Sequence, residues 1–313
     1  MDTETWIKSV IRGIMCLIGI IGNNWLCISS LPKSISQLKT SDILFVNLAV
    51  SNLITNYLVD ILDIFQTEND IHVGTLYCGI RFFLPEFSET SSILTTMYIT
   101  VYWYQKLVGS LKRGGAPVRM DSLHFIAILL MGSWTFALVI NFPHFFFVAE
   151  IAENMTPECI EELPSPEAEQ AYEVVYITLA NVFPLIGILF ACVQIARTLL
   201  QNEKRMRNMG AEAGNGGNSS AEQNGDGTNN VSTVTKSKAQ AKTGSLLRAA
   251  KSVVAVAILF LICWAIHLIV RIIGSIKKSS VIDDVESFVG ASYTCSIPYI
   301  YLYGVQKLTC PCC

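Results

Sequence analysis

Seven long stretches of mostly apolar residues, separated by segments that carry most of the charges, constrain this chain more than any other sequence feature. Each stretch is long enough to cross the bilayer interior as a helix, which takes about 20 residues. A helix satisfies its own backbone hydrogen bonds in lipid, whereas a lone strand does not. We therefore predict an all-α membrane protein, a bundle of seven transmembrane helices. The predicted spans are residues 10–31, 43–64, 76–104, 123–148, 174–200, 252–273 and 285–303.

The composition excludes most other classes of protein. Apolar residue types make up 51% of the 313 residues and charged types only 15%, against about 25% charged residues in soluble domains. A soluble enzyme, a disulfide-rich secreted module and a disordered chain are therefore poor fits. The first span is longer than the apolar core of a signal peptide, which has about 7–15 residues, so we expect it to be retained.

The loops between the predicted spans sort by charge into two sides. One side holds 16 of the 22 Lys and Arg residues and only six of the 25 Asp and Glu residues. Basic residues stay on the cytoplasmic side of a membrane protein, so we expect the N-terminus outside and the C-terminus inside. Residues 1–313 then form a single seven-helix domain. Within it, residues 208–240 have a centre rich in Gly, Asn and Ser, and we expect them to be a disordered insertion in the third intracellular loop.

Two of the ten cysteines, Cys78 and Cys159, fall near the predicted outer face. Cys78 lies at the start of the third span, and Cys159 lies in the loop after the fourth span. Disulfides form and persist in the oxidising extracellular environment. We therefore predict a disulfide between these two residues, and the alternative is two free thiols.

Two further places are candidates for modification. Cys310, Cys312 and Cys313 cluster just past the last span, where S-palmitoylation would anchor the tail to the membrane. An unmodified tail is the alternative. Asn154 begins an Asn-Met-Thr glycosylation sequon in the predicted outer loop, and the proline directly behind this sequon leaves its use open.

Acidic residues inside predicted spans are candidates for function, because burying a charge in a membrane is expensive. Glu86 and Glu89 lie three residues apart in the third span, so they share one helix face. Asp60 and Asp63 have the same spacing near the outer end of the second span. If these faces point inward, they place carboxylates around an outer cavity, with Glu86, Glu89 and Asp63 as candidate ligand-binding residues. For the two aspartates, a solvated rim is the alternative.

The sixth span adds two candidate ligand-binding residues, His267 and Arg271, which lie one turn apart. Arg81 lies at the outer end of the third span. One interpretation is a small polar ligand between the helices, with its charged group at Glu89, Glu86 or Arg271. The alternative is that the carboxylates pair with the arginines and have no ligand role. The acidic outer face would concentrate cations, whereas Arg271 would favour acids, so the charge of the ligand is open.

Several residues of these spans resemble landmarks of rhodopsin-like G-protein-coupled receptors. They are Gly22-Asn23, Asn47-Leu48-Ala49, Cys78, Trp134, Pro184, Cys263-Trp264, and Pro298 with Tyr301. The resemblance implies a receptor that activates a heterotrimeric G protein. It also implies that Trp264, Pro298 and Tyr301 act as an activation switch, with ordinary core packing as the alternative for Trp264.

Other residues depart from that pattern and resemble a narrower group, the vomeronasal type-1 receptors and the fish olfactory receptors related to class A. Asn52 replaces a usual aspartate, Tyr102-Trp103-Tyr104 replaces Asp-Arg-Tyr, and Ile297 replaces an asparagine before Pro298. Residues 92–117 look most like the fish set. This resemblance implies a small odorant or pheromone as ligand and the plasma membrane of sensory neurons as location.

Little in the sequence indicates an enzyme. The four histidines are scattered without metal-ligand spacing, and no Gly-x-Ser-x-Gly or phosphate-binding glycine motif is present. The seventh span has no lysine that could form a Schiff base with retinal. We therefore expect no catalytic residue, metal, cofactor or nucleic-acid partner. A transporter or ligand-gated channel that uses the buried carboxylates is the alternative function.

Overall fold

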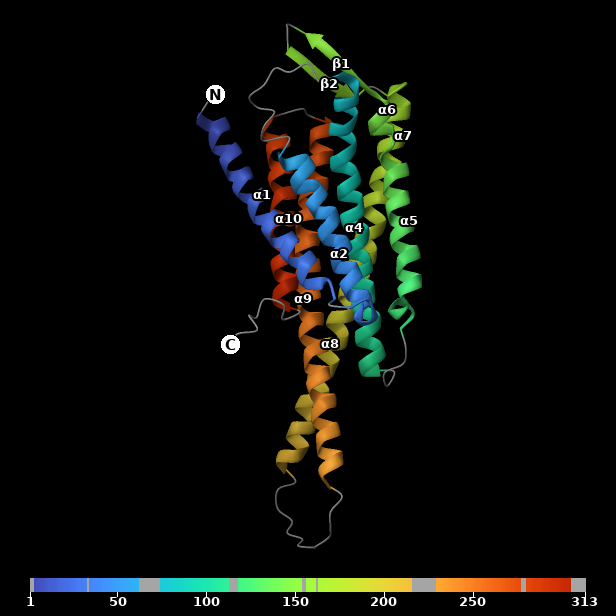
Figure 1. Cartoon of the computed structure of the whole chain (residues 1–313), viewed down its shortest axis with the longest axis vertical. Coiled ribbons are helices and arrows are strands. Elements are labelled where there is room, and N and C mark those ends of the chain that lie inside the picture. Colours follow the sequence, from blue (N-terminus) through green and yellow to red (C-terminus); the bar gives the residue numbers. More distant parts are fainter. Residues whose placement is uncertain are drawn as a thin grey trace.

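The computed structural model describes residues 3–32, 34–61, 74–112, 118–153, 156–161, 163–215, 229–276 and 280–304, which form an elongated bundle of helices (Figure 1). Seven helical stretches of these residues run along the bundle, and each overlaps one predicted span, so the predicted seven-helix fold is confirmed. The stretches are α1 (Thr3–Ser30), α2 (Thr40–Ile54) with η2 (Thr55–Asp60), α4 (Gly74–Lys112), α5 (Leu123–Asn141), α7 (Pro166–Tyr176) with η4 (Ile177–Val182) and α8 (Phe183–Asn215), α9 (Asn229–Ile276), and α10 (Ser280–Gly304).

The helices differ in how apolar they are. Among the described residues, five stretches are long and apolar enough to cross a membrane, and they lie in α1, α2 with η2, α5, α7 to α8, and α9. α4 instead carries buried hydroxyl side chains, among them Ser91, Ser92, Thr95 and Thr96. Because α4 packs against α2, α5, α8 and α9, these polar groups face other helices rather than lipid.

The bundle is closed by the packing of α10 against α9 and α1, and of α1 against α2. The core at this junction is apolar: Leu48 is fully buried, and the rings of Phe45 and Tyr301 lie 4.9 Å apart between centroids. Gly22 lets α1 approach α10 closely, since a Cβ atom there would lie 2.7 Å from the ring of Tyr299. A larger residue at position 22 would therefore push the first and last helices apart.

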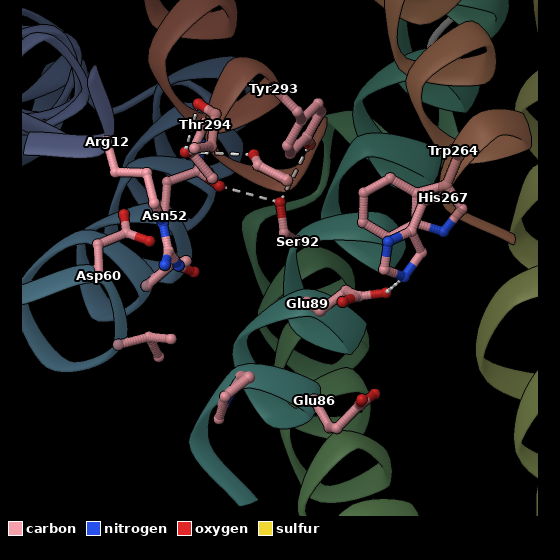
Figure 2. Close-up of a pocket in the computed structure, with 15 residues that line it drawn as sticks. Arg12, Asn52, Asp60, Glu86, Glu89, Ser92, Trp264, His267, Tyr293 and Thr294 are labelled. Atoms are coloured by element: carbon pink, nitrogen blue, oxygen red, sulfur yellow. Dashed lines mark hydrogen bonds and ion pairs between the residues drawn. The ribbon is translucent and has the colours of Figure 1, made fainter. Parts of the chain in front are cut away.

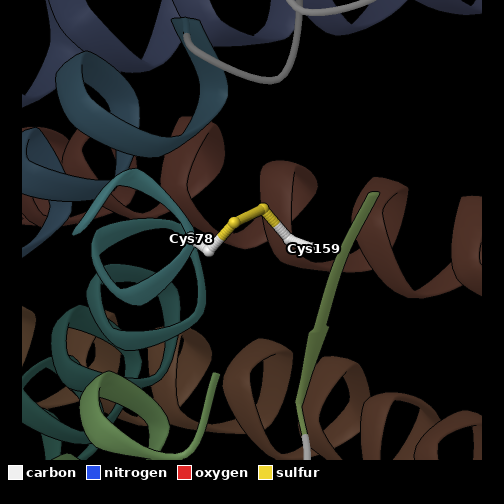
Figure 3. The surroundings of a disulfide bond; sticks show 2 residues. All are labelled: Cys78 and Cys159. Carbon is white, nitrogen blue, oxygen red and sulfur yellow. A yellow bond between two sulfur atoms is a disulfide. The ribbon is translucent and has the colours of Figure 1, made fainter. Parts of the chain in front are cut away.

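A β-hairpin of β1 (Val148–Glu153) and β2 (Thr156–Glu161) lies at one end of the bundle, which we call the hairpin end (Figure 1). The strands are antiparallel, with Glu150 opposite Cys159. A disulfide joins Cys159 to Cys78 in the second turn of α4, with their Cα atoms 5.4 Å apart (Figure 3). The predicted disulfide is therefore confirmed.

The fourth span ends earlier than predicted. The sequence predicts helix from residue 123 to residue 148, but α5 ends at Asn141 and the short helix α6 (Pro143–Phe146) follows it. Pro143 has no backbone N–H to continue the hydrogen-bond ladder of α5, and it is the first residue of α6 instead. The chain then passes into β1, and His144 is buried at the hairpin end.

At the opposite end, which we call the stalk end, α8 and α9 continue together beyond the other helices (Figure 1). α8 reaches Asn215 and α9 begins at Asn229. Helix therefore covers both edges of the segment 208–240 for which the sequence predicts disorder, and residues 216–228 lie outside the described residues. The helix-favouring residues before Asn215, such as Glu203 and Lys204, explain why α8 continues past the apolar part of its span.

We expect either cysteine replacement, Cys78→Ser or Cys159→Ser, to lower the surface expression and the thermal stability of the protein. A cross-link between residues 81 positions apart stabilises a fold by about 4 kcal/mol in the chain-entropy model. Cell-surface labelling of an epitope-tagged chain and thermal unfolding in detergent measure the two effects. Cys27→Ser, at a free cysteine, is the matched control. Two disulfide variants that behave like this control would contradict the prediction.

Candidate functional site

A cavity of about 280 Å³ opens among α1, α2, η2, α4, α9 and α10 (Figure 2). Its α4 residues come from the first half of that helix, so the cavity lies toward the hairpin end. Glu86 and Glu89 reach it from α4, Trp264 and His267 from α9, and Tyr293 from α10. The lining thus combines carboxylates, an imidazole and aromatic rings from α4 and from the last two helices of the bundle.

A neutral hydrogen-bond network forms the part of the lining nearest the stalk end. The Ser92 hydroxyl donates to Asn52 Oδ1 at 3.0 Å and shares a hydrogen bond of 3.0 Å with the Tyr293 hydroxyl (Figure 2). Asn52 Nδ2 in turn donates to Asn23 Oδ1 at 3.1 Å. An aspartate at position 52 would have no N–H to donate to Asn23. The network therefore accounts for the asparagine at this position.

Arg271 and Glu86 form a buried ion pair. Arg271 Nη1 donates to both carboxylate oxygens of Glu86, at 2.9 and 3.1 Å. The Tyr176 hydroxyl also donates to Glu86, and the Arg271 guanidinium lies 4.9 Å from the centre of the Tyr176 ring. Glu173 lies 3.6 Å from Arg271 Nη2. The protein thus engages the Arg271 guanidinium through Glu86, Glu173 and the Tyr176 ring, and Arg271 is not among the described residues that line the cavity.

Glu89 lies one turn further along α4 and has a different partner. Its Oε1 is 3.1 Å from His267 Nε2 (Figure 2), and the two side chains are 19% and 9% exposed. Both residues line the cavity. The structure therefore separates the two glutamates: Glu86 pairs with a permanent cation, whereas Glu89 pairs with an imidazole that is charged only when protonated.

Trp264 connects the cavity to two neighbouring helical segments. Its indole Nε1 donates to Asn181 Oδ1 at 2.9 Å, across to the π-helical segment η4. Its ring stacks on Phe260 with 4.7 Å between centroids and lies 5.6 Å from the Tyr293 ring. Sequence reasoning overlooked Asn181 and Tyr293. An uncharged polar residue inside an otherwise apolar span was the available signal for Asn181.

The other residues chosen from the sequence have separate positions. Asp60, in η2, lines the cavity on the same side as Arg12 of α1 (Figure 2). Arg12 was overlooked because it lies near the start of the first predicted span. Arg81 is exposed. Pro298 and Tyr301 are not among the described residues that line the cavity, so any role in switching would be indirect.

Five chosen residues lie outside the described part of the chain, and their roles stay predictions: Asp63, Asn154, Cys310, Cys312 and Cys313. Within the described ranges, no group of three or more His, Cys, Asp or Glu residues is arranged to hold a metal ion.

A second polar cluster joins the hairpin to the helices, beyond the end of the membrane-spanning helix α5. His144 Nδ1 lies 2.6 Å from Glu161 Oε1 of β2, and the histidine ring meets the rings of Tyr172 and Tyr176 edge-on. Burial by itself lowers the pKa of His144. The hydrogen bond to Glu161 and the nearby charge of Glu86 outweigh burial, so the pKa of His144 is raised above its ordinary value of 6.5.

Comparisons with known proteins agree with this architecture. The family model described as 7 transmembrane receptor (rhodopsin family) matches residues 23–301. C-X-C chemokine receptor type 1 of Oryctolagus cuniculus is 21% identical over 318 residues, which cover 96% of this chain and 77% of that protein. Rhodopsin of Cambarus maculatus is 22% identical over 273 residues, covering 86% and 82% of the two chains. Squid rhodopsin, a solved crystal structure, has the same fold, with a TM-score of 0.71 at 19% identity over 96% of this chain and 77% of that one.

We expect Arg271→Met to destabilise the protein by about 3–5 kcal/mol, because it leaves the Glu86 carboxylate buried without its cation. Adding Glu86→Gln in a double variant should recover most of this loss, and thermal unfolding in detergent measures both. Glu173→Gln is the matched control, since Glu173 is partly exposed and such pairs contribute about 0–1 kcal/mol. A double variant less stable than Arg271→Met alone would refute this account of the pair.

We also expect His144 to make stability depend on pH. Its raised pKa means that folding favours the protonated ring, so this contribution is fully present below the ordinary value of 6.5. It is lost as the pH rises through the higher pKa of the folded protein. The decrease in unfolding temperature between mildly acidic and mildly alkaline buffer should therefore be smaller in Glu161→Gln than in wild type. Glu169→Gln, at an exposed position, is the control, and identical pH profiles for all three proteins would rule the effect out.

Proposed function

This chain belongs to the rhodopsin family of seven-transmembrane receptors, and we propose that it is a chemosensory member that detects a small odorant or pheromone. As a G-protein-coupled receptor of this family it is a multi-pass membrane protein and not an enzyme. In the proposal, the ligand binds in the cavity among α4, α9 and α10. The occupied receptor then activates a heterotrimeric G protein in the plasma membrane of a sensory neuron.

The observation that carries this proposal is the cavity itself. Its volume of about 280 Å³ is near the lower end of small-molecule sites, which have about 300–1,000 Å³. Polar groups at Glu89 and His267 converge on it beside the aromatic ring of Trp264. A few polar groups on an aromatic wall are the usual composition of a small-ligand site.

We place the hairpin end outside the cell and the stalk end inside. β1 and β2 together contain four glutamates and no basic residue, and the disulfide at this end requires an oxidising compartment. Toward the stalk end, α8 carries Arg197, Lys204, Arg205 and Arg207. This distribution follows the tendency of basic residues to stay in the cytoplasm. The cavity then opens toward the extracellular side.

In the proposed mechanism, Trp264 transmits binding toward the stalk end. A ligand that moves this ring alters its hydrogen bond to Asn181 and its stacking on Phe260. Further along α10, Pro298 interrupts the helix ladder and makes bending easier there. Bending would move Tyr301, which packs on Phe45 of α2. The ligand thereby biases the bundle between two arrangements of similar energy.

The chemosensory assignment is supported by the departures from the common receptor pattern, which fit their surroundings. Asn52 donates into the neutral network described above. Tyr102, in place of the usual acidic residue, donates to Asp121 at 3.3 Å, and Lys106 lies 2.6 Å from the same carboxylate. These residues are the ones that resemble the vomeronasal type-1 and fish olfactory receptors.

Two other functions are less well supported. Some relatives are rhodopsins, but α10 has no lysine between residues 285 and 303 to hold retinal. A transporter or ligand-gated channel would use buried carboxylates as an ion path, whereas Glu86 here is neutralised by Arg271. Family membership also favours a receptor over an ion path.

Nucleotide exchange on purified heterotrimeric G proteins tests the receptor function. Wild-type protein in lipid vesicles should accelerate GDP–GTP exchange above empty vesicles for at least one G-protein class, and Trp264→Ala should reduce that rate. Trp25→Ala, which removes the same side chain from an exposed position on α1, is the matched control. Ion current through the same vesicles in the absence of any G protein would favour the channel instead.

A further inference from the structure

Among the described residues that line the cavity, carboxylates outnumber permanent positive charges. The lining includes three acidic residues, Asp60, Glu86 and Glu89, and one arginine, Arg12. Glu86 is balanced from behind the lining by Arg271, and Arg12 supplies one positive charge against the other two carboxylates. The remaining carboxylate, Glu89, is paired with His267, whose charge depends on protonation.

Arg271 does not supply a free positive charge for an acidic ligand. It makes two hydrogen bonds to Glu86, lies over the ring of Tyr176, and has Glu173 at 3.6 Å. An acid could reach it only by displacing Glu86, which would leave that carboxylate buried and unpaired. The sequence leaves the charge of the ligand open between Arg271 and the glutamates, and this geometry favours the glutamates.

Glu89 is the carboxylate best placed to receive a cation. It lines the cavity, and its contact on the protein side is to His267, at 3.1 Å. An excess charge inside a membrane protein is costly unless a counter-charge approaches it. In Figure 2 the Glu89 and His267 side chains meet beside the ring of Trp264, on the opposite side of the view from Arg12 and Asp60.

Aromatic rings define the rest of the preferred ligand. Trp264 lies 5.4 Å from the His267 ring and 5.6 Å from the Tyr293 ring, measured between centroids, and all three residues line the cavity. A flat apolar group beside Glu89 would pack against these rings. The faces of Trp and Tyr also attract a cation.

We propose that the ligand is a small aryl-alkyl ammonium cation, held by a charge-assisted hydrogen bond from its ammonium group to Glu89 with its ring against Trp264 and Tyr293. This inference rests on the proposed function, because it names the class of ligand for the same cavity. It assigns Glu89 the binding role and Glu86 the structural one.

The experiment compares ligands that differ only in their charged group. Phenylalkylamines with one to four methylene groups are each paired with the alcohol and the carboxylic acid of the same chain length. Binding is read from the thermal stabilisation of purified wild-type protein, and signalling from nucleotide exchange on its G protein. At least one amine should stabilise and activate the receptor at lower concentration than its paired alcohol and acid.

Variants then locate the counter-charge. Glu89→Gln keeps the shape of the side chain. It should weaken the binding of that amine by about 30-fold or more, as expected when one partner of a buried charged pair is lost. Potency for the paired alcohol should change little. Asp284→Asn, which removes a partly exposed carboxylate paired with Lys8 near the N-terminal end of α10, should leave amine potency near wild type.

The possible outcomes separate this inference from the proposed function. If the acids or alcohols bind better than every amine while nucleotide exchange persists, the ligand class is wrong and the receptor function stands. Equal amine potency in Glu89→Gln and wild type would equally overturn the assignment to Glu89. Failure of the protein to support nucleotide exchange at all, with or without ligand, would remove the proposed function. The comparison of ligands on wild type needs no variant, so it holds even if Glu89→Gln folds poorly.

Discussion

The structure depends on one constraint: in a bilayer, every polar group must find its partner inside the protein. The backbone meets this condition by forming seven helical stretches. The side chains of α4 meet it by facing other helices, so that Ser91 bonds to Ser51 and Ser92 to Asn52. A helix with this many hydroxyl groups has to lie where it is surrounded by protein, and α4 occupies that place.

The same constraint arranges the charged residues. Glu86 can be buried because Arg271, Tyr176 and Glu173 form a cluster around the salt bridge. This cluster joins α4, α7 and α9, three elements from separate parts of the chain. Once Arg271 is held there, the charge character of the cavity is decided by Glu89, whose partner His267 has a variable charge. Arg271 therefore influences the charge of the cavity by pairing with Glu86, although Arg271 itself is not among the described residues that line it.

The positions of the helices and the disulfide could be predicted from the sequence, because the length of an apolar run and the charges beside it are properties of the chain alone. The end of α5 and the β-hairpin were missed because a hydropathy pattern continues through Pro143 although the helix does not. The pairing within the site was also beyond reach. Spacing placed Glu86 and Glu89 on one face, but only the rotation of α9 against α4 decides that Arg271 meets the first and His267 the second. Asn181 and Tyr293 join the site through partners from other helices, which no local pattern records.

The two attachments of β2 affect how molecules can enter the bundle. Cys159 and Glu161 are two residues apart on an extended strand, so their side chains leave it on the same side, one to the disulfide with Cys78 and the other to His144. Two attachments on one face, one of them covalent, hold this strand against α4 and α6. We therefore expect β2 to act as a fixed rim, so that a molecule entering from the hairpin end passes beside it.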